Sequence, residues 1–147
     1  MKHENRKKHG FTLIEMLVVI AIIAVLVAII VPTVTSATAR ANAATDAANL
    51  RSVLGVANTI LLVEEASPAA ALAGAQSFEC KTFTGAEAYI AYISPGFIEP
   101  YFKSGENYYG LKYFSDIAET GSTAETAVSA PEGTLYKVGG DEVGGED

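Results

Sequence analysis

Few side chains in this sequence are suited to acid–base, nucleophilic or metal chemistry. Its histidines, His3 and His9, both stand in a basic N-terminal stretch, so the rest of the chain cannot build a histidine-based triad or metal site. The single cysteine, Cys80, excludes an internal disulfide and a CxxC site. Neither a GxxxxGKS/T nor a GxGxxG phosphate-binding loop is present. We therefore expect a protein that is not an enzyme and has no cofactor and no metal site.

One carboxylate, Glu15, stands where its charge is unusual. From Phe11 to Val31 the only other polar residue is Thr12. As a helix, this segment would be about 32 Å long, which is enough to cross a bilayer core of about 30 Å. A carboxylate is costly inside a membrane, although less so near the end of a helix. We therefore expect Glu15 to need a partner, and no charged residue follows it until Arg40.

The charges on either side of this segment differ in sign. Residues 1–10 contain four basic residues and one acidic residue, a net charge of +3, whereas the rest of the chain contains six basic and sixteen acidic residues, a net charge of −10. A basic leader, an apolar span and an acidic domain predict a single-pass topology with the N-terminus in the cytoplasm and the domain exported. The acidic balance also argues against nucleic-acid binding by the folded domain.

The segment from Lys7 to Met16, KKHGFTLIEM, resembles the processing site of type IV prepilins and related pseudopilins. In that family, a membrane-embedded aspartyl peptidase cuts after the glycine and methylates the new terminal amine. The resemblance implies a cut between Gly10 and Phe11, an N-methylated Phe11, and Glu15 as the acidic fifth residue of the mature chain.

The same resemblance, which covers about residues 6–60, implies how such a subunit assembles. Glu15 of one subunit would meet the Phe11 amine of a neighbour in a helical bundle, and Pro32 would kink the helix. Many relatives have a glycine eight residues before that proline, but this chain has Ala24. Because alanine favours a helix more than glycine does, the resemblance gives less reason to expect the helix to melt locally during assembly.

The resemblance implies a structural subunit of a type IV pilus or similar extracellular filament. Its partners would be other copies of itself, related pilins, the prepilin peptidase, an inner-membrane assembly platform and, before assembly, membrane lipid. It would move from the cytoplasmic membrane to the cell surface. A single cysteine precludes the C-terminal disulfide frequent in Gram-negative pilins and favours a Gram-positive source.

Three other interpretations stay open. The first is a pseudopilin of a type II secretion or DNA-uptake system, and the second is a bitopic, membrane-anchored binding domain. The third is a secreted protein whose signal peptide is cut after Ala37-Thr38-Ala39, an A-x-A pattern before Arg40.

The expected fold class is α+β: a long kinked N-terminal helix, membrane-spanning in its first half, packed on a small antiparallel sheet, as in pilins. The helix should continue to about Val63, with one apolar stripe facing the domain. The stripe comprises Ala47, Leu50, Val53, Leu54, Ala57, Ile60 and Leu61. The expected segments are a leader at 1–10, a membrane helix at 11–31, its amphipathic continuation at 32–63, a globular domain at 64–138 and an acidic flexible tail at 139–147.

Within the domain, composition predicts several short elements. Ser67 to Gln76 is predicted as a loop or short helix, and Ser94 to Gly96 as a turn. Strands are predicted at Phe78–Phe83, Tyr108–Ser115 and Thr134–Val138. Thr84 and Glu87 have the spacing of a capping box that would open a helix through Ile93, although a strand there is also open.

The remaining candidate residues each have two interpretations. Cys80 is either a small core residue or a reactive thiol. The seven tyrosines either pack in the core or form a binding patch. The acidic residues of the tail are either solvated or bind Ca²⁺, although no DxDxDG loop is present. These tail residues are Asp141, Glu142, Glu146 and Asp147.

Overall fold

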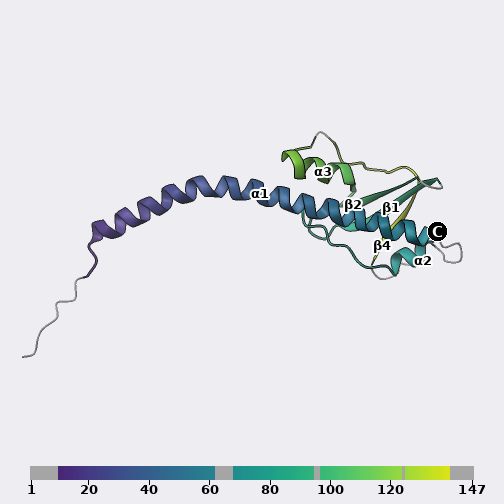
Figure 1. Cartoon of the computed structure of the whole chain (residues 1–147), viewed down its shortest axis with the longest axis horizontal. Coiled ribbons are helices and arrows are strands. Elements are labelled where there is room, and N and C mark those ends of the chain that lie inside the picture. The colour runs from purple at the N-terminus through teal and green to yellow at the C-terminus, as the bar shows by residue number, and fades with distance from the viewer. Residues whose placement is uncertain (1–9, 62–67, 95–96, 124, 140–147) are drawn as a thin grey trace, which may run out of the picture. The chain divides into compact units, whose positions relative to one another are not determined.

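The computed structural model describes residues 10–61, 68–94, 97–123 and 125–139. The chain divides into two compact units, Met1–Ser36 and Ala37–Asp147. The helices are α1 (Leu13–Leu61), α2 (Pro68–Ala73) and α3 (Leu111–Thr120), and the strands are β1 (Glu87–Ser94), β2 (Phe97–Ser104), β3 (Asn107–Gly110) and β4 (Thr134–Val138) (Figure 1).

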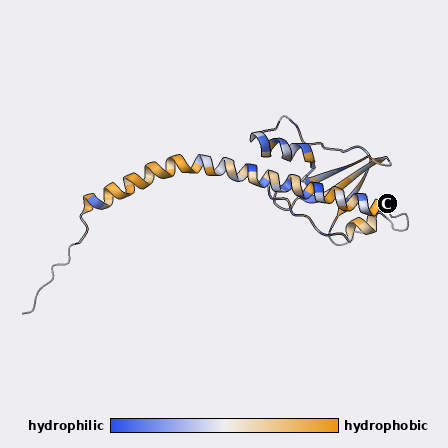
Figure 2. Ribbon diagram, in the orientation of Figure 1, coloured by the Kyte–Doolittle hydropathy of each residue, from blue (hydrophilic) through white to orange (hydrophobic). Residues whose placement is uncertain are grey.

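The first unit contains the apolar part of α1. From Met16 to Val31 every residue is hydrophobic, so all faces of the helix are apolar. Figure 2 shows this part of the ribbon in the hydrophobic colour, and the large apolar side chains are exposed. By length and composition, α1 can cross a membrane. The helix continues through Pro32, near which Thr33 and Thr35 donate hydroxyl hydrogen bonds to the carbonyls of Ile30 and Val31.

The second unit combines the rest of α1 with a four-stranded antiparallel sheet in the order β3-β2-β1-β4. The α+β class and the packing of a long helix on a small antiparallel sheet are therefore confirmed. One face of α1 is completely or almost completely buried. It consists of Ala43, Ala47, Leu50, Val53 and Ala57. Their spacing of three and four residues is that of a helix with one apolar stripe.

The buried face of α1 differs from the predicted apolar stripe in its membership. Leu54 and Leu61 are half-buried rather than buried, and Ala43 and the carboxylate Asp46 belong to the buried face. The end of the helix predicted at Val63 lies outside the described residues, because the description of α1 stops at Leu61.

The predicted strand at Phe78–Phe83 is wrong. Asp46, fully buried on α1, accepts hydrogen bonds from the backbone N–H groups of Lys81 (2.6 Å) and Thr82 (2.8 Å). These donors are therefore satisfied by a side chain instead of by a neighbouring strand. The segment folds as a series of bends that brings Cys80 into the core.

The helix proposed to open at Thr84 is also wrong, and the alternative strand is right. In β1, Ala88 and Ile90 face the main core, whereas Tyr89 and Ala91 pack in a smaller cluster on the opposite face. This period of two is that of a strand. Apolar residues on both faces hid the alternation, because most positions are hydrophobic.

The predicted strand at Tyr108–Ser115 is half right. β3 ends at Gly110, and Leu111 begins α3, whose Phe114 is buried against Phe102. The guanidinium of Arg40 on α1 donates hydrogen bonds to the carbonyls of Ala118 (3.1 Å) and Glu119 (2.7 Å). A cation at the C-terminal end of a helix satisfies carbonyls that lack partners within that helix.

Strand β2 was not predicted from the sequence, and it lies inside the sheet although it contains Pro100. Strand β4 is confirmed with the predicted bounds, and α2 forms within the segment predicted as a loop or short helix. The turn predicted at 94–96 and the flexible tail lie largely outside the described residues, which include Ser94 and, from the tail, Gly139.

Candidate processing and assembly site

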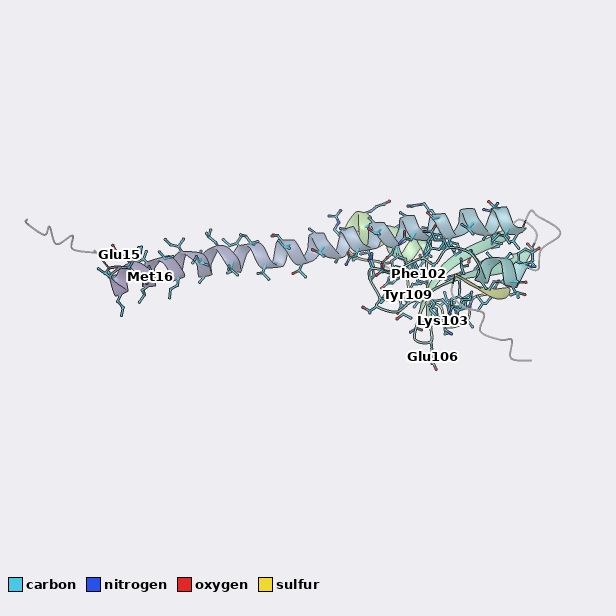
Figure 3. All side chains as sticks on the ribbon, turned by 90° about the horizontal axis from the view of Figure 1, so that it is seen from below. Glu15, Met16, Phe102, Lys103, Glu106 and Tyr109 are labelled. Atoms are coloured by element: carbon cyan, nitrogen blue, oxygen red, sulfur yellow. The ribbon has the colours of Figure 1, made fainter. Side chains whose placement is uncertain are left out.

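The start of α1 is a capping box formed by Thr12 and Glu15. The backbone N–H and the hydroxyl of Thr12 both donate to Oε2 of Glu15, at 2.7 and 3.0 Å. In return, the backbone N–H of Glu15 donates to the Thr12 hydroxyl at 3.3 Å. Reciprocal bonds of this kind satisfy backbone donors that have no partner at a helix N-terminus. Figure 3 shows Glu15 on the first turn of α1.

This geometry gives Glu15 a partner within its own chain. Thr12 is an uncharged partner, so the expectation that Glu15 needs a partner did not lead to it as long as only charged groups were considered. The signal was present, because Thr12-x-x-Glu15 before an apolar run is the sequence pattern of a capping box. The favourable position of a carboxylate in the first turn of a helix strengthens the arrangement.

The peptide bond between Gly10 and Phe11 precedes the helix. Residues 10–12 have no helical structure, and both Gly10 and Phe11 are exposed, Phe11 to 81%. A Cβ atom added at Gly10 would meet no atom of the described residues within 4 Å. The described part of the fold therefore does not itself require glycine at position 10.

Beyond the capping box, the first unit presents an uninterrupted apolar surface. Leu13, Ile14, Ile20 and Ile29 are each more than 60% exposed, and the side chains between them are similarly uncovered. Exposed apolar area on this scale is unfavourable in water. The surface must therefore be covered by lipid or by other apolar helices.

A comparison with protein-family models matches residues 5–31 to the prokaryotic N-terminal methylation motif. This segment carries a prepilin-type methylation motif. The motif is the cleavage and methylation signature of type IV pilins, as the resemblance of the segment KKHGFTLIEM implies. Comparisons with curated proteins and with solved structures found no match. The second unit, Ala37–Asp147, therefore has to be interpreted from its own structure.

The motif contains the candidate residues Gly10, Phe11 and Glu15, and it ends one residue before Pro32. The geometry brings Thr12 and Glu15 together and places the Gly10–Phe11 bond at an accessible position. Cleavage after Gly10, methylation of Phe11, pairing of Glu15 with a neighbouring subunit and a kink at Pro32 stay predictions.

The other candidate residues are accounted for by packing. Cys80 is buried, and its thiol lies 3.5 Å from Oδ2 of Asp46. Burial, with a smaller contribution from the Asp46 charge, raises the pKa of Cys80 to about 11, so its thiol is protonated at neutral pH. This is the opposite of the low pKa found in reactive cysteines.

The tyrosines divide between the two faces of the sheet. Tyr109 and Tyr113 pack with Phe83 in the main core, with ring centroids 4.3 and 6.3 Å from that of Phe83. Tyr101 and Tyr108 are nearly buried on the opposite face. These contacts favour packing over a tyrosine-rich binding patch, while the acidic residues 141–147 lie outside the described part of the chain.

Proposed function

We propose that this chain is a structural subunit of a type IV pilus or a related filament. It would be made as a precursor, cut between Gly10 and Phe11 by the prepilin peptidase, methylated on Phe11, and assembled through α1. In this proposal the protein has no catalytic activity of its own. The observation that carries the proposal is the methylation motif at residues 5–31, which ends in an exposed apolar helix.

The start of α1 supports this proposal physically. A membrane peptidase needs an accessible, unwound substrate bond, and the Gly10–Phe11 bond lies before the first helical residue. Removal of the leader would leave an ammonium on Phe11, four residues from Glu15. Two opposite unit charges about 4 Å apart interact by about 4 kcal/mol at an effective dielectric of 20. Desolvation offsets much of this free energy, so the pair would mainly set the register between subunits.

A secreted protein cut before Arg40 is less well supported. Residues 37–39 lie in the middle of α1, and Arg40 itself holds the C-terminal end of α3. A cut at this position would have to break a helix that continues from Arg40 to Leu61. A pseudopilin of a secretion or DNA-uptake system has the same motif and stays an alternative within the proposal.

The proposal is tested by the N-terminus of the mature protein. Mass spectrometry of the membrane and sheared surface fractions should find a chain that begins with N-methylated Phe11. A chain beginning with Met1 would support an uncut anchored domain, and one beginning with Arg40 would support a secreted protein. Either result would overturn the proposal.

Replacing the glycine tests the recognition of the cleavage site. Gly10→Val should accumulate as the longer precursor in the membrane, because a peptidase that approaches the backbone closely has no room for a branched Cβ. Since Gly10 has open space around it in this chain, the variant should remain folded. Gly55→Val is the matched control, because Gly55 is also exposed with no atom near its missing Cβ, and this variant should be processed normally.

A further inference from the structure

In the sheet of the second unit, one half of β2 lacks a neighbouring strand on the side of β3. Strand β3 pairs with β2 only from Tyr101 to Ser104, whereas β1 pairs with β2 from Phe97 to Lys103. On the side of β3, no strand among the described residues adjoins Phe97–Pro100. The cause is local, because the chain leaves the sheet at Gly110 and turns directly into α3.

Along Phe97–Pro100, the backbone groups of alternate residues point away from β1. Ser104 pairs with Asn107 across a two-residue turn, so the N–H and C=O groups of Ser104 face β3. Because neighbouring residues of a strand alternate, those of Phe102, Pro100 and Ile98 face the same side. Pro100 is tolerated inside the sheet for this reason, since its missing N–H would point to the unpaired edge.

A groove of about 500 Å³ lies along this edge. Ile98, Glu99, Pro100 and Tyr101 of β2 form one wall, and Leu54 of α1 contributes apolar surface. The beginning of α3 and the segment around Val128 complete the lining. The volume lies in the range of known binding clefts. The groove therefore joins an unpaired strand edge to an apolar floor.

The charges of the groove favour a cation. Among the lining residues, Glu99 and Glu125 are acidic and Lys112 is basic. The Lys112 ammonium pairs with Asp116 at 2.6 Å and, at the longer distance of 3.5 Å, with Oε2 of Glu125. Apart from this ion pair, the buried Oε2 of Glu125 accepts no hydrogen bond within the described part of the chain.

The surroundings of Tyr101 indicate the same sign of potential. The Tyr101 hydroxyl donates a hydrogen bond to Glu99. Burial raises the pKa of Tyr101, and so do this bond and the nearby charges of Glu99, Glu125 and Glu132. The nearby Arg51 donates a hydrogen bond to Ser115 at 3.4 Å and is not among the lining residues.

We propose that this groove binds an extended peptide segment of a partner protein, which adds a strand beside Phe97–Pro100 of β2 and places a lysine or arginine side chain between Glu99 and Glu125. Backbone hydrogen bonds to the strand edge would supply affinity, and the carboxylates would supply selectivity, as in other cases of strand addition. The proposal concerns the second unit and does not depend on how the N-terminus is processed.

The test uses the full chain in detergent micelles and a defined probe. The probe is a fluorescent seven-residue peptide with blocked ends, alternating valine and threonine, with lysine at its centre. We expect it to bind, and we expect the same peptide with a central glutamate to bind at least tenfold more weakly. Hydrogen exchange at the Ile98 amide should slow when the lysine peptide is present.

Two N-methylated versions of the peptide test strand addition directly. Each has methyl groups on one of the two alternating sets of amides, so that one version loses the donors that face β2 and the other keeps them. One version should lose binding and the other should retain it. Equal binding by both, or no binding by the unmodified lysine peptide at millimolar concentration, would overturn the proposal.

Variants of the protein test the position of the groove. Glu99→Gln combined with Glu125→Gln should weaken binding of the lysine peptide at least fivefold while leaving the thermal transition near that of the wild type. Glu106→Gln removes the same kind of charge from the exposed β2–β3 turn (Figure 3) and should bind as the wild type does. Unchanged affinity in the double variant would also contradict the proposal.

Discussion

Asp46 stabilises the loop at residues 78–83, which precedes β1. It is fully buried, and its carboxylate receives the backbone N–H groups of two consecutive residues, Lys81 and Thr82. A buried carboxylate is tolerated only when it is hydrogen-bonded in this way. The sequence contained no signal for this role, because an aspartate among alanines on a helix is ordinarily a solvated residue.

We expect Asp46→Ala to destabilise the domain by about 3 kcal/mol, because two part-buried hydrogen bonds from backbone N–H groups to a charged acceptor would be lost. Thermal unfolding of the full chain in micelles would measure the loss. Glu79→Gln is the control, since the Glu79 side chain is exposed and pairs with Lys81 at the surface, where such pairs contribute little. A loss in Asp46→Ala no larger than in this control would show that the loop does not depend on the carboxylate.

Cys80 should respond to pH in a defined window. Burial raises its pKa to about 11, from an ordinary value of about 9 in the unfolded chain. The folded state therefore holds its proton more tightly, so this contribution to stability is complete below pH 9 and is lost as the pH rises from about 9 to about 11. Wild-type protein should lose more thermal stability than Cys80→Ala between pH 8 and pH 10.5, and native Cys80 should alkylate slowly at pH 8. Equal losses in both proteins would contradict this assignment.

Among the elements, the long helix and β4 were predictable from the sequence, whereas β2 and α3 were not. An unbroken apolar run and a short β-branched and aromatic segment are strong local signals. Pro100 argues against a strand in any sequence analysis, and only the unpaired half-edge of β2 makes it acceptable. Tyr108 to Ser115 is uniformly rich in aromatic residues, so nothing in its composition marks the change from strand to helix at Gly110.

The connection that leads into β4 depends on Gly133. Its φ angle is +92°, and an added Cβ would lie 2.3 Å from the carbonyl oxygen of Tyr92 in β1. We expect Gly133→Ala to destabilise the domain by about 3 kcal/mol or more, because both backbone strain and a backbone clash must be relieved. Because the chain contains no tryptophan, chemical denaturation followed by circular dichroism would measure this loss of stability.

Gly85 provides the matched comparison for this element. It also has a positive φ angle, +74°, but no atom lies within 4 Å of its missing Cβ. Gly85→Ala should therefore cost about 1 kcal/mol from backbone strain alone. If the two variants were equally stable, the close approach of Gly133 to the backbone of β1 would make no contribution to the stability of the domain.

At the scale of the whole molecule, the methylation motif at the N-terminus was predictable because it depends on local sequence. The basic leader, Gly10, Phe11, Glu15 and the apolar run lie within one continuous segment, and the family match covers the same residues. The groove beside β2 brings together residues from α1, β2, α3 and the segment around Val128, which are distant in sequence. No single segment carries a signal for it, so it could be found only from the fold.

The two roles of Glu15 can be separated by two substitutions, and this separates a pilin subunit from a simple membrane anchor. In the first role, which the structure shows, Glu15 completes the capping box with Thr12. In the second role, which is our proposal, Glu15 would neutralise the Phe11 ammonium of a neighbouring subunit. Glutamine serves in a capping box almost as well as glutamate but carries no charge. Alanine removes both functions. Both variants should insert, because each deletes a charge from a membrane helix.

If only capping matters, Glu15→Gln should form filaments as the wild type does, and Glu15→Ala alone should be impaired. If pairing with the ammonium is required, both variants should be cleaved after Gly10 yet stay in the membrane fraction, because an unpaired ammonium in an apolar bundle is strongly destabilising. We expect the second result. The measurement is the ratio of sheared surface filaments to membrane protein for each variant, with mass spectrometry to establish that cleavage has occurred. Wild-type filament yield from Glu15→Gln would contradict charge pairing and leave the capping box as the reason for a glutamate at this position.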